Sequence, residues 1–246
     1  MIDRVVWESR HKFVYYDEDC ENQILDMISN YPAKLDSDEP IVVYIKDDGL
    51  PKLDSKLNLE SYSIRSFHNR YFELLIFLAI IDILIKNIDK DILDEKLSRM
   101  FRLCSYTANK KIDCVVDLRE MLSRSIDSYR EAYVKYQENG ELNFYETIEF
   151  PFLMMYNSLE CLKDEINLKK YFALLIEIDN DTLYNQMAIN NYIASRCNGC
   201  LSVNVLCSKY DWKYYYSSNG QLIEYIYDYT KVDLRKNKDK VKSIHI

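Results

Sequence analysis

The segment from Lys169 to Leu234 constrains the fold of this chain more than any other. It contains an apolar run, Tyr171 to Ile176, that is followed at once by Glu177 and Asp179. An apolar run of this length bounded by charge predicts a buried strand of an α/β sheet. Carboxylates just past the carboxyl end of such a strand lie where open α/β sheets bind ligands. A helical pattern and a second apolar strand, Leu201 to Cys207, come next, so the segment predicts the second half of a nucleotide-binding sheet.

The first part of the chain supplies two more strand patterns. Phe13 to Tyr16 is the clearest part of the first, and Asp17-Glu18-Asp19 then starts a helix. Asp17 is the candidate N-cap, and the acids suit the positive end of the helix dipole. The β-branched run Ile41 to Ile45 predicts a second strand. We expect residues 41–45 and 171–176 to be neighbouring strands of a mainly parallel sheet.

Most of the region between these strands has helical periodicity. Apolar residues at three- and four-residue spacing predict two helices over residues 61–104 and one long amphipathic helix over 114–139. The predicted fold class is therefore α/β, with a helix-rich insertion (61–140) ahead of the acidic strand. A chain of 246 residues has the length of one sizeable domain, so we expect a single domain, 1–246.

Charge argues against a nucleic-acid-binding protein. The net charge of −8 and the sequence pI near 5.1 do not provide the basic field that coating of DNA or RNA needs. One basic segment, Lys231 to Lys242, carries Asp233 and Asp239. We interpret residues 235–246 as a solvated basic tail and expect no direct nucleic-acid binding.

Neither a membrane segment nor a metal site is expected. The residues after Met1 lack the apolar run of a signal peptide, and the longest apolar run, Leu74 to Ile85, contains Asp82 and is too short to span a bilayer. Three isolated histidines do not assemble a zinc site or a His-based triad. Seven cysteines without a repeating spacing predict reduced thiols and hence a cytoplasmic protein.

The order of elements in 169–234 resembles the Walker B and sensor region of bacterial ATPases of the origin-recognition-like AAA group. In that family an apolar run ending in Asp-Glu precedes a Gln and an Asn-hydrophobic-Ile helix that ends in Arg. A strand, a Tyr/Gly-rich hairpin and an Asp-Tyr before a hydrophobic-Asp-Leu follow. The resemblance covers this quarter of the chain well and the rest loosely, and it implies a P-loop NTPase-like core. The residues that carry it are Leu174 to Asn180, Gln186, Asn190 to Ile193, Arg196, Val203 to Lys209, Gly220 to Glu224, Asp228, Tyr229 and Val232 to Leu234.

The resemblance implies a phosphate-binding loop, which we assign to the segment after the strand at 41–45. A working loop, G-x-x-x-x-G-K-[ST], uses glycines so that backbone N–H groups cradle phosphate, a Lys for the outer phosphates and a hydroxyl for Mg²⁺. Here Gly49 fits the first glycine, but Asp54 falls on the second, Ser55 on the Lys and Lys56 on the hydroxyl. The aspartate would repel a triphosphate and the Mg²⁺ ligand is lost, so the loop is degenerate. The alternative is an ordinary surface turn.

The Walker B-like strand departs from the family pattern as well. Glu177 falls on the Mg²⁺-binding Asp and Ile178 on the Glu that polarises the attacking water, and isoleucine cannot accept a proton. Asp179 could compensate only with a register shift, because neighbouring strand residues point to opposite faces. Arg196 lies where such ATPases place an arginine that acts on a neighbour's nucleotide; alternatively it complements its own helix dipole. Only residues 235–246 follow Leu234, so we expect neither the helical lid nor a DNA-binding winged helix.

These observations predict a catalytically degenerate, lid-less AAA-like module that acts by binding a partner protein. The expected partner is a full-length ATPase, another subunit of a bacterial defence or mobile-element system, or a second copy of this chain. No tightly bound cofactor is expected. One alternative is an active ATPase with Lys52 or Lys56 on phosphate and Glu177 or Asp179 on Mg²⁺. The other is an unrelated α/β scaffold with an accidental similarity.

Overall fold

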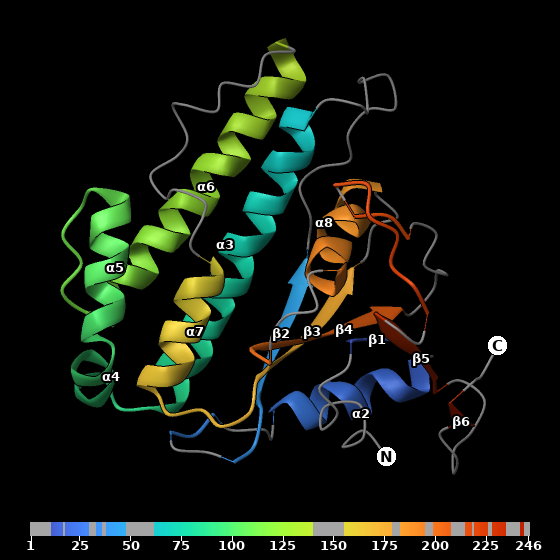
Figure 1. The fold of residues 1–246 in the computed structure, drawn as a ribbon, viewed down its shortest axis with the longest axis horizontal. Helices are drawn as coiled ribbons and strands as arrows, with labels where there is room; N and C mark the ends of the chain where they lie inside the picture. Colours follow the sequence, from blue (N-terminus) through green and yellow to red (C-terminus); the bar gives the residue numbers. More distant parts are fainter. Residues whose placement is uncertain are drawn as a thin grey trace. The chain divides into compact units, whose positions relative to one another are not determined.

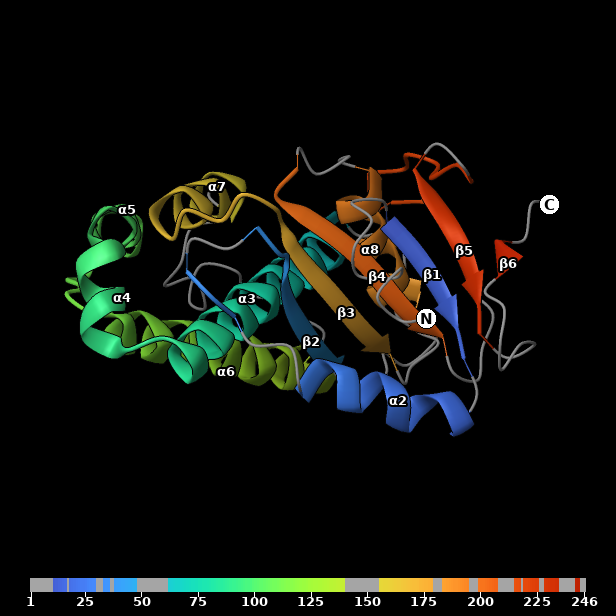
Figure 2. The ribbon, with the colours of Figure 1, turned by 90° about the horizontal axis from the view of Figure 1, so that it is seen from below.

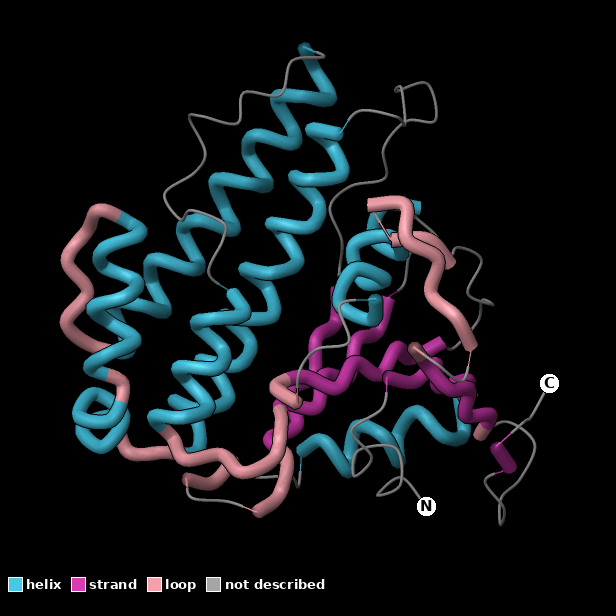
Figure 3. Tube along the Cα trace, in the orientation of Figure 1, coloured by secondary structure: helices cyan, strands magenta, loops and turns pink. Residues whose placement is uncertain are grey.

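The computed structural model describes residues 11–16, 18–29, 33–35, 38–47, 62–139, 155–178, 183–194, 199–207, 215–217, 219–225, 228–234 and 242–243. The chain groups into two compact units (Figures 1 and 3). We call Met1–Pro32, Ser37–Gly49 and Lys169–Ile246 the sheet unit, and Ala33–Asp36 and Leu50–Leu168 the helical unit. The single-domain interpretation of 1–246 stays a prediction.

Among the described residues, the sheet unit has six strands in the order β2-β3-β4-β1-β5-β6 (Figure 2). The first five in chain order run parallel, and β6 is antiparallel to β5. The predicted pairing of residues 41–45 with 171–176 is confirmed, because Ile41 lies opposite Phe172 and the register continues to the strand ends. The strands are β1 (His11–Tyr15), β2 (Ile41–Asp47), β3 (Phe172–Ile178), β4 (Leu201–Cys207), β5 (Tyr229–Asp233) and β6 (Lys242–Ser243).

Helices α2 (Glu18–Ser29) and α8 (Leu183–Ala194) lie on opposite faces of this sheet (Figures 1 and 2). The chain crosses from β1 to β2 in one direction and from β3 to β4 in the other, and right-handed crossovers then place the two helices on different faces. On the α2 side, Ile24 packs in a core with alternate residues of the strands. That core contains Val14, Tyr16, Val42, Tyr171, Ala173, Leu175, Leu206, Val232 and Leu234.

A short hairpin before β5 is tied to α8. Tyr216 and Leu222 form an antiparallel bridge, and the side-chain amide of Asn190 on α8 donates to the backbone carbonyl of Tyr216 at 3.0 Å. Gly220 has a φ of +80°, which the tight turn requires and which side chains with a Cβ rarely adopt. The Tyr/Gly-rich hairpin implied by the family resemblance is therefore present.

The helical unit contains five helices among the described residues. These are α3 (Tyr62–Asn87), α4 (Lys90–Lys96), α5 (Ser98–Ala108), α6 (Val115–Asn139) and α7 (Met155–Glu165). The two long helices, α3 and α6, pack side by side (Figure 1). The prediction of two helices over 61–104 is wrong, because the second is divided at Leu97 into α4 and α5. None of the described helices is long and apolar enough to cross a membrane.

The predicted fold class is confirmed. The protein is an α/β protein with a mainly parallel sheet and helices on both sheet faces, and the helix-rich insertion lies between β2 and β3.

Candidate functional site

The carboxyl ends of β1, β4 and β5 come together at one edge of the sheet. The backbone N–H of Tyr16 donates to Cys207 at 3.3 Å, and that of Leu234 donates to Tyr15 at 2.7 Å. From β1 the chain crosses towards the β2 end of the sheet, and from β4 it crosses towards the β5 end. In open α/β sheets, ligands bind outside the carboxyl ends of the strands at such a switch point. The topology thus indicates the β1–α2 connection as a candidate ligand position.

The residues at this connection do not fit a nucleotide phosphate. They read Tyr16-Asp17-Glu18-Asp19-Cys20, with neither a glycine for close backbone approach nor a lysine for the outer phosphates. The Tyr16 side chain is fully buried directly after β1. Helix α2 begins at Glu18, so carboxylates stand in the sequence where a phosphate-binding helix presents free N–H groups. Sequence reasoning missed this connection, because β1 carries no local sign of its central place in the sheet.

Glu177 lies at the carboxyl end of β3, opposite Lys46 of β2. The Tyr44 hydroxyl, also from β2, donates a hydrogen bond to Glu177 Oε2, and Lys46 Nζ lies 3.6 Å from Oε1. The Glu177 side chain is 8% exposed and that of Lys46 is 48% exposed. Each carboxylate oxygen therefore already has a protein partner, one from each of two residues on the adjacent strand.

The electrostatics of Tyr44 follow from this contact. Burial raises the pKa of Tyr44 above its usual range, and the hydrogen bond to Glu177 and the negative charge of that carboxylate raise it further. Tyr16 and Glu21 add smaller effects in the same direction. Tyr44 therefore remains a neutral donor at any physiological pH, which holds the Glu177 oxygen in place.

Comparison with known families gives an assignment that covers most of the chain. A family model described as ORC-CDC6-like matches residues 27–243, which is most of the sequence. The chain belongs to the ORC-CDC6-like family. Comparison with curated proteins and with solved structures gave no match. The origin-recognition-like resemblance is thereby confirmed, and an accidental similarity of an unrelated scaffold is excluded. The matched range leaves out β1, so the assignment itself does not describe the β1–α2 connection.

Of the site residues predicted for this ORC-CDC6-like chain, the structure describes Glu177. It places Glu177 at the predicted sheet edge, but with Tyr44 and Lys46, which sequence reasoning did not select. Strand β2 lies at the edge of the sheet and β1 lies between β4 and β5. The other predicted residues lie outside the described part of the chain, and their roles stay predictions: Gly49, Lys52, Ser55, Lys56, Asp179 and Arg196.

The arrangement around Glu177 suits a structural contact better than a metal site. Tyr44 donates to Oε2 and Lys46 lies 3.6 Å from Oε1, so a metal ion at Glu177 would share the carboxylate with these two partners. Among the described residues, no group of three or more His, Cys, Asp or Glu side chains could hold a metal ion.

Replacing Tyr44 with phenylalanine is expected to lower the free energy of unfolding by about 1.5–3 kcal/mol. The change removes a charge-assisted hydrogen bond and leaves Oε2 of the buried Glu177 without its donor. Urea unfolding measures the effect. The matched control is Tyr216→Phe on the exposed hairpin, which should change stability by less than about 0.5 kcal/mol. Equal urea midpoints for Tyr44→Phe and the wild type would show that the contact contributes nothing.

Proposed function

We propose that this chain is a catalytically degenerate member of the ORC-CDC6-like family that acts as a binding or regulatory subunit for a partner protein. The partner we favour is a larger ATPase of a bacterial defence or mobile-element system. The free state of the described cysteines supports a cytoplasmic location. The active-ATPase alternative needs Lys52, Lys56 and Asp179 in catalytic roles.

The observation that carries the proposal is the state of Glu177. In the Walker B-like position a carboxylate has to bind Mg²⁺, but Tyr44 and Lys46 already engage both of its oxygens. Displacing Tyr44 from a nearly buried carboxylate would cost about 1.5–3 kcal/mol. Mg²⁺ would therefore have to compete with Tyr44 and Lys46 for the oxygens of Glu177.

The β1–α2 connection supports the same proposal independently. We infer that this connection, at the switch point of the sheet, is the position where a relative with full activity would hold phosphate. Asp17, Glu18 and Asp19 follow β1 closely in sequence, and their charges repel a triphosphate. Both candidate phosphate loops depart from the pattern: the β1–α2 connection carries Asp17, Glu18 and Asp19, and the segment Gly49 to Lys56 has Asp54 in place of the second glycine and Ser55 in place of the lysine.

ATP and ADP, with and without Mg²⁺, are expected to leave the unfolding temperature unchanged, and the protein should show no Mg²⁺-dependent ATP turnover. A ligand that binds the native state at 100 times its Kd stabilises it by about 2.7 kcal/mol, so millimolar nucleotide would reveal even weak binding. Thermal shift and phosphate release measure the two properties. Glu177→Gln and Asp179→Asn should behave like the wild type in both.

The opposite result has an equally clear meaning. A Mg²⁺-dependent shift together with turnover that Glu177→Gln abolishes would replace the proposal with the active-ATPase alternative. Lys52 and Lys56 would then be the next residues to change. Arg196 remains the candidate for an arginine that acts on the nucleotide of a partner ATPase.

A further inference from the structure

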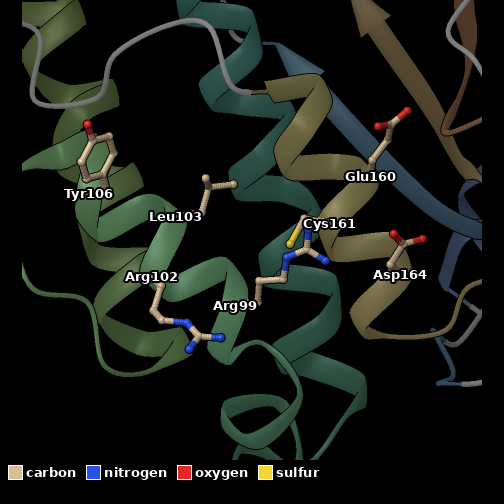
Figure 4. Close-up of a pocket in the computed structure, with 7 residues that line it drawn as sticks. All are labelled: Arg99, Arg102, Leu103, Tyr106, Glu160, Cys161 and Asp164. Carbon is tan, nitrogen blue, oxygen red and sulfur yellow. The ribbon is translucent and has the colours of Figure 1, made fainter.

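Helices α5 and α7 of the helical unit border a groove with a volume of about 730 Å³ (Figure 4). All the residues that line the groove belong to the helical unit, whereas Glu177 belongs to the sheet unit. Its size is in the range of pockets that bind ligands or several side chains of a partner. The residues that line it are Arg99, Arg102, Leu103 and Tyr106 from α5, and Glu160, Cys161 and Asp164 from α7.

The two helices are locked together at one end. Glu165 at the end of α7 accepts the backbone N–H groups of Arg99 at 3.0 Å and of Met100 at 3.2 Å. These are among the first N–H groups of α5, which have no partner within the helix. The capping contact fixes the beginning of α5 beside the end of α7, so the helices run antiparallel along the groove. The hydrogen bonds of Glu165 therefore hold the two helices that form the groove in a fixed arrangement at one end.

The two walls of the groove carry opposite charge. Arg99 and Arg102 are exposed on α5, whereas Glu160 and Asp164 are exposed on α7. Within the part of the chain that the structure describes, none of these four side chains forms an ion pair. In Figure 4, Arg99 extends from α5 towards α7 and ends beside Cys161. Between the two walls lie the half-buried Leu103 and the buried Cys161, and burial raises the pKa of the Cys161 thiol.

An exposed aromatic side chain marks one end of the groove. Tyr106 is 87% exposed, the largest exposed fraction among the exposed large hydrophobic residues that the structure describes. Tyrosine and arginine are the side chains that most often anchor protein–protein interfaces. A small anion is a poor occupant, because Glu160 and Asp164 would repel it across the groove.

We propose that the α5–α7 groove binds an amphipathic helix of a partner protein. The apolar stripe of that helix lies on Leu103 and Cys161, an acidic row follows α5 and a basic row follows α7. A third helix packs against two neighbours in this way when its ridges enter the groove between them. The charge order selects the partner, because like charges across an interface are costly. The groove is the surface through which the chain binds the partner protein of the proposed function, so this inference rests on that proposal.

The test uses three synthetic helical peptides of about 18 residues, long enough to form a helix. Each has the same leucine stripe, flanked by Glu on one side and Lys on the other (mixed), by Glu on both sides, or by Lys on both sides. Fluorescence anisotropy should show the mixed peptide binding the wild type about tenfold more tightly than either uniform peptide. The reason is that several ion pairs between the peptide and the two walls of the groove, each of modest energy, add together.

Changing one wall should change the preferred peptide. The double variant Arg99→Glu with Arg102→Glu makes both walls acidic and should prefer the Lys peptide. Glu160→Lys with Asp164→Lys makes both walls basic and should prefer the Glu peptide. The matched control, Arg124→Glu with Lys135→Glu on the exposed face of α6, should keep the wild-type order.

Two outcomes would overturn the proposal. One is a peptide order that the wall variants leave unchanged, or equal binding of all three peptides. The other is a wild-type dimer in sedimentation velocity that Arg102→Glu dissociates, since this would assign the groove to a second copy of the chain. Neither result involves nucleotide, so failure of the groove proposal is distinct from the appearance of ATP turnover.

Discussion

Replacing Phe13 with alanine is expected to lower the free energy of unfolding of the sheet unit by about 3–5 kcal/mol. Phe13 is completely buried on β1, the strand between β4 and β5. Its ring meets that of Tyr229 edge to face at 4.8 Å and lies 6.5 Å from that of Tyr215. The substitution removes this burial, opens a cavity and breaks both aromatic contacts, each of which adds about 0.5–1.5 kcal/mol.

Urea unfolding followed by tryptophan fluorescence measures this loss. Trp7 precedes β1 in the sequence and Trp212 follows β4, so both belong to segments of the sheet unit. The matched control is Leu222→Ala, whose side chain is exposed on the hairpin and whose loss should cost less than about 0.5 kcal/mol. Similar midpoints for the Phe13 and Leu222 variants would contradict the central place of β1 in this sheet.

Acid is expected to destabilise the sheet unit through His11. Burial lowers the pKa of His11 from about 6.5 to about 4; Asp228 opposes this effect and Lys12 adds to it. Nδ1 of His11 accepts the backbone N–H of Val203 at 3.0 Å, which only an unprotonated nitrogen can do. Below pH 6.5 the unfolded chain takes up a proton that the folded chain refuses. The stability present above pH 6.5 is therefore lost as the pH falls towards 4, by up to about 3 kcal/mol.

His11→Asn isolates this contribution, because the asparagine side chain supplies an acceptor to Val203 but does not titrate. The free energy of unfolding of the wild type and the variant should be compared at pH 7.5 and at pH 4.5. We expect the loss between these two pH values to be smaller in the variant by about 2–3 kcal/mol. An equal loss in both proteins would show that His11 is not the group that couples folding to protons.

Elements with a strong local pattern could be predicted from the sequence. The long amphipathic helix predicted over 114–139 is α6, and the apolar run Leu201 to Cys207 is β4 with the same bounds. Strand β5 (Tyr229–Asp233) was not predicted, because it is short and two polar residues, Thr230 and Lys231, separate its apolar residues Tyr229 and Val232. The break at Leu97 was missed because the apolar periodicity continues through it.

The candidate site was predictable in part. Glu177 could be selected because a carboxylate directly after a buried apolar run lies at the sheet edge where α/β proteins bind ligands. Its partner Tyr44 could not, because the two residues are 133 positions apart and only the pairing of β2 with β3 joins them. The groove between α5 and α7 depends likewise on Glu165, which caps a helix that begins 67 positions earlier at Ser98.

Local patterns were enough to predict the α/β class, most of the helices and strands, and the origin-recognition-like family, because these depend on local periodicity and on the order of short motifs. The strand order, the contacts of Glu177 with Tyr44 and Lys46, and the placement of arginines and carboxylates on the two helices of the α5–α7 groove depend on the tertiary structure. These features arise from contacts between distant segments. Such contacts depend on how strands pair and helices pack, and they leave no periodic trace in either partner's own sequence.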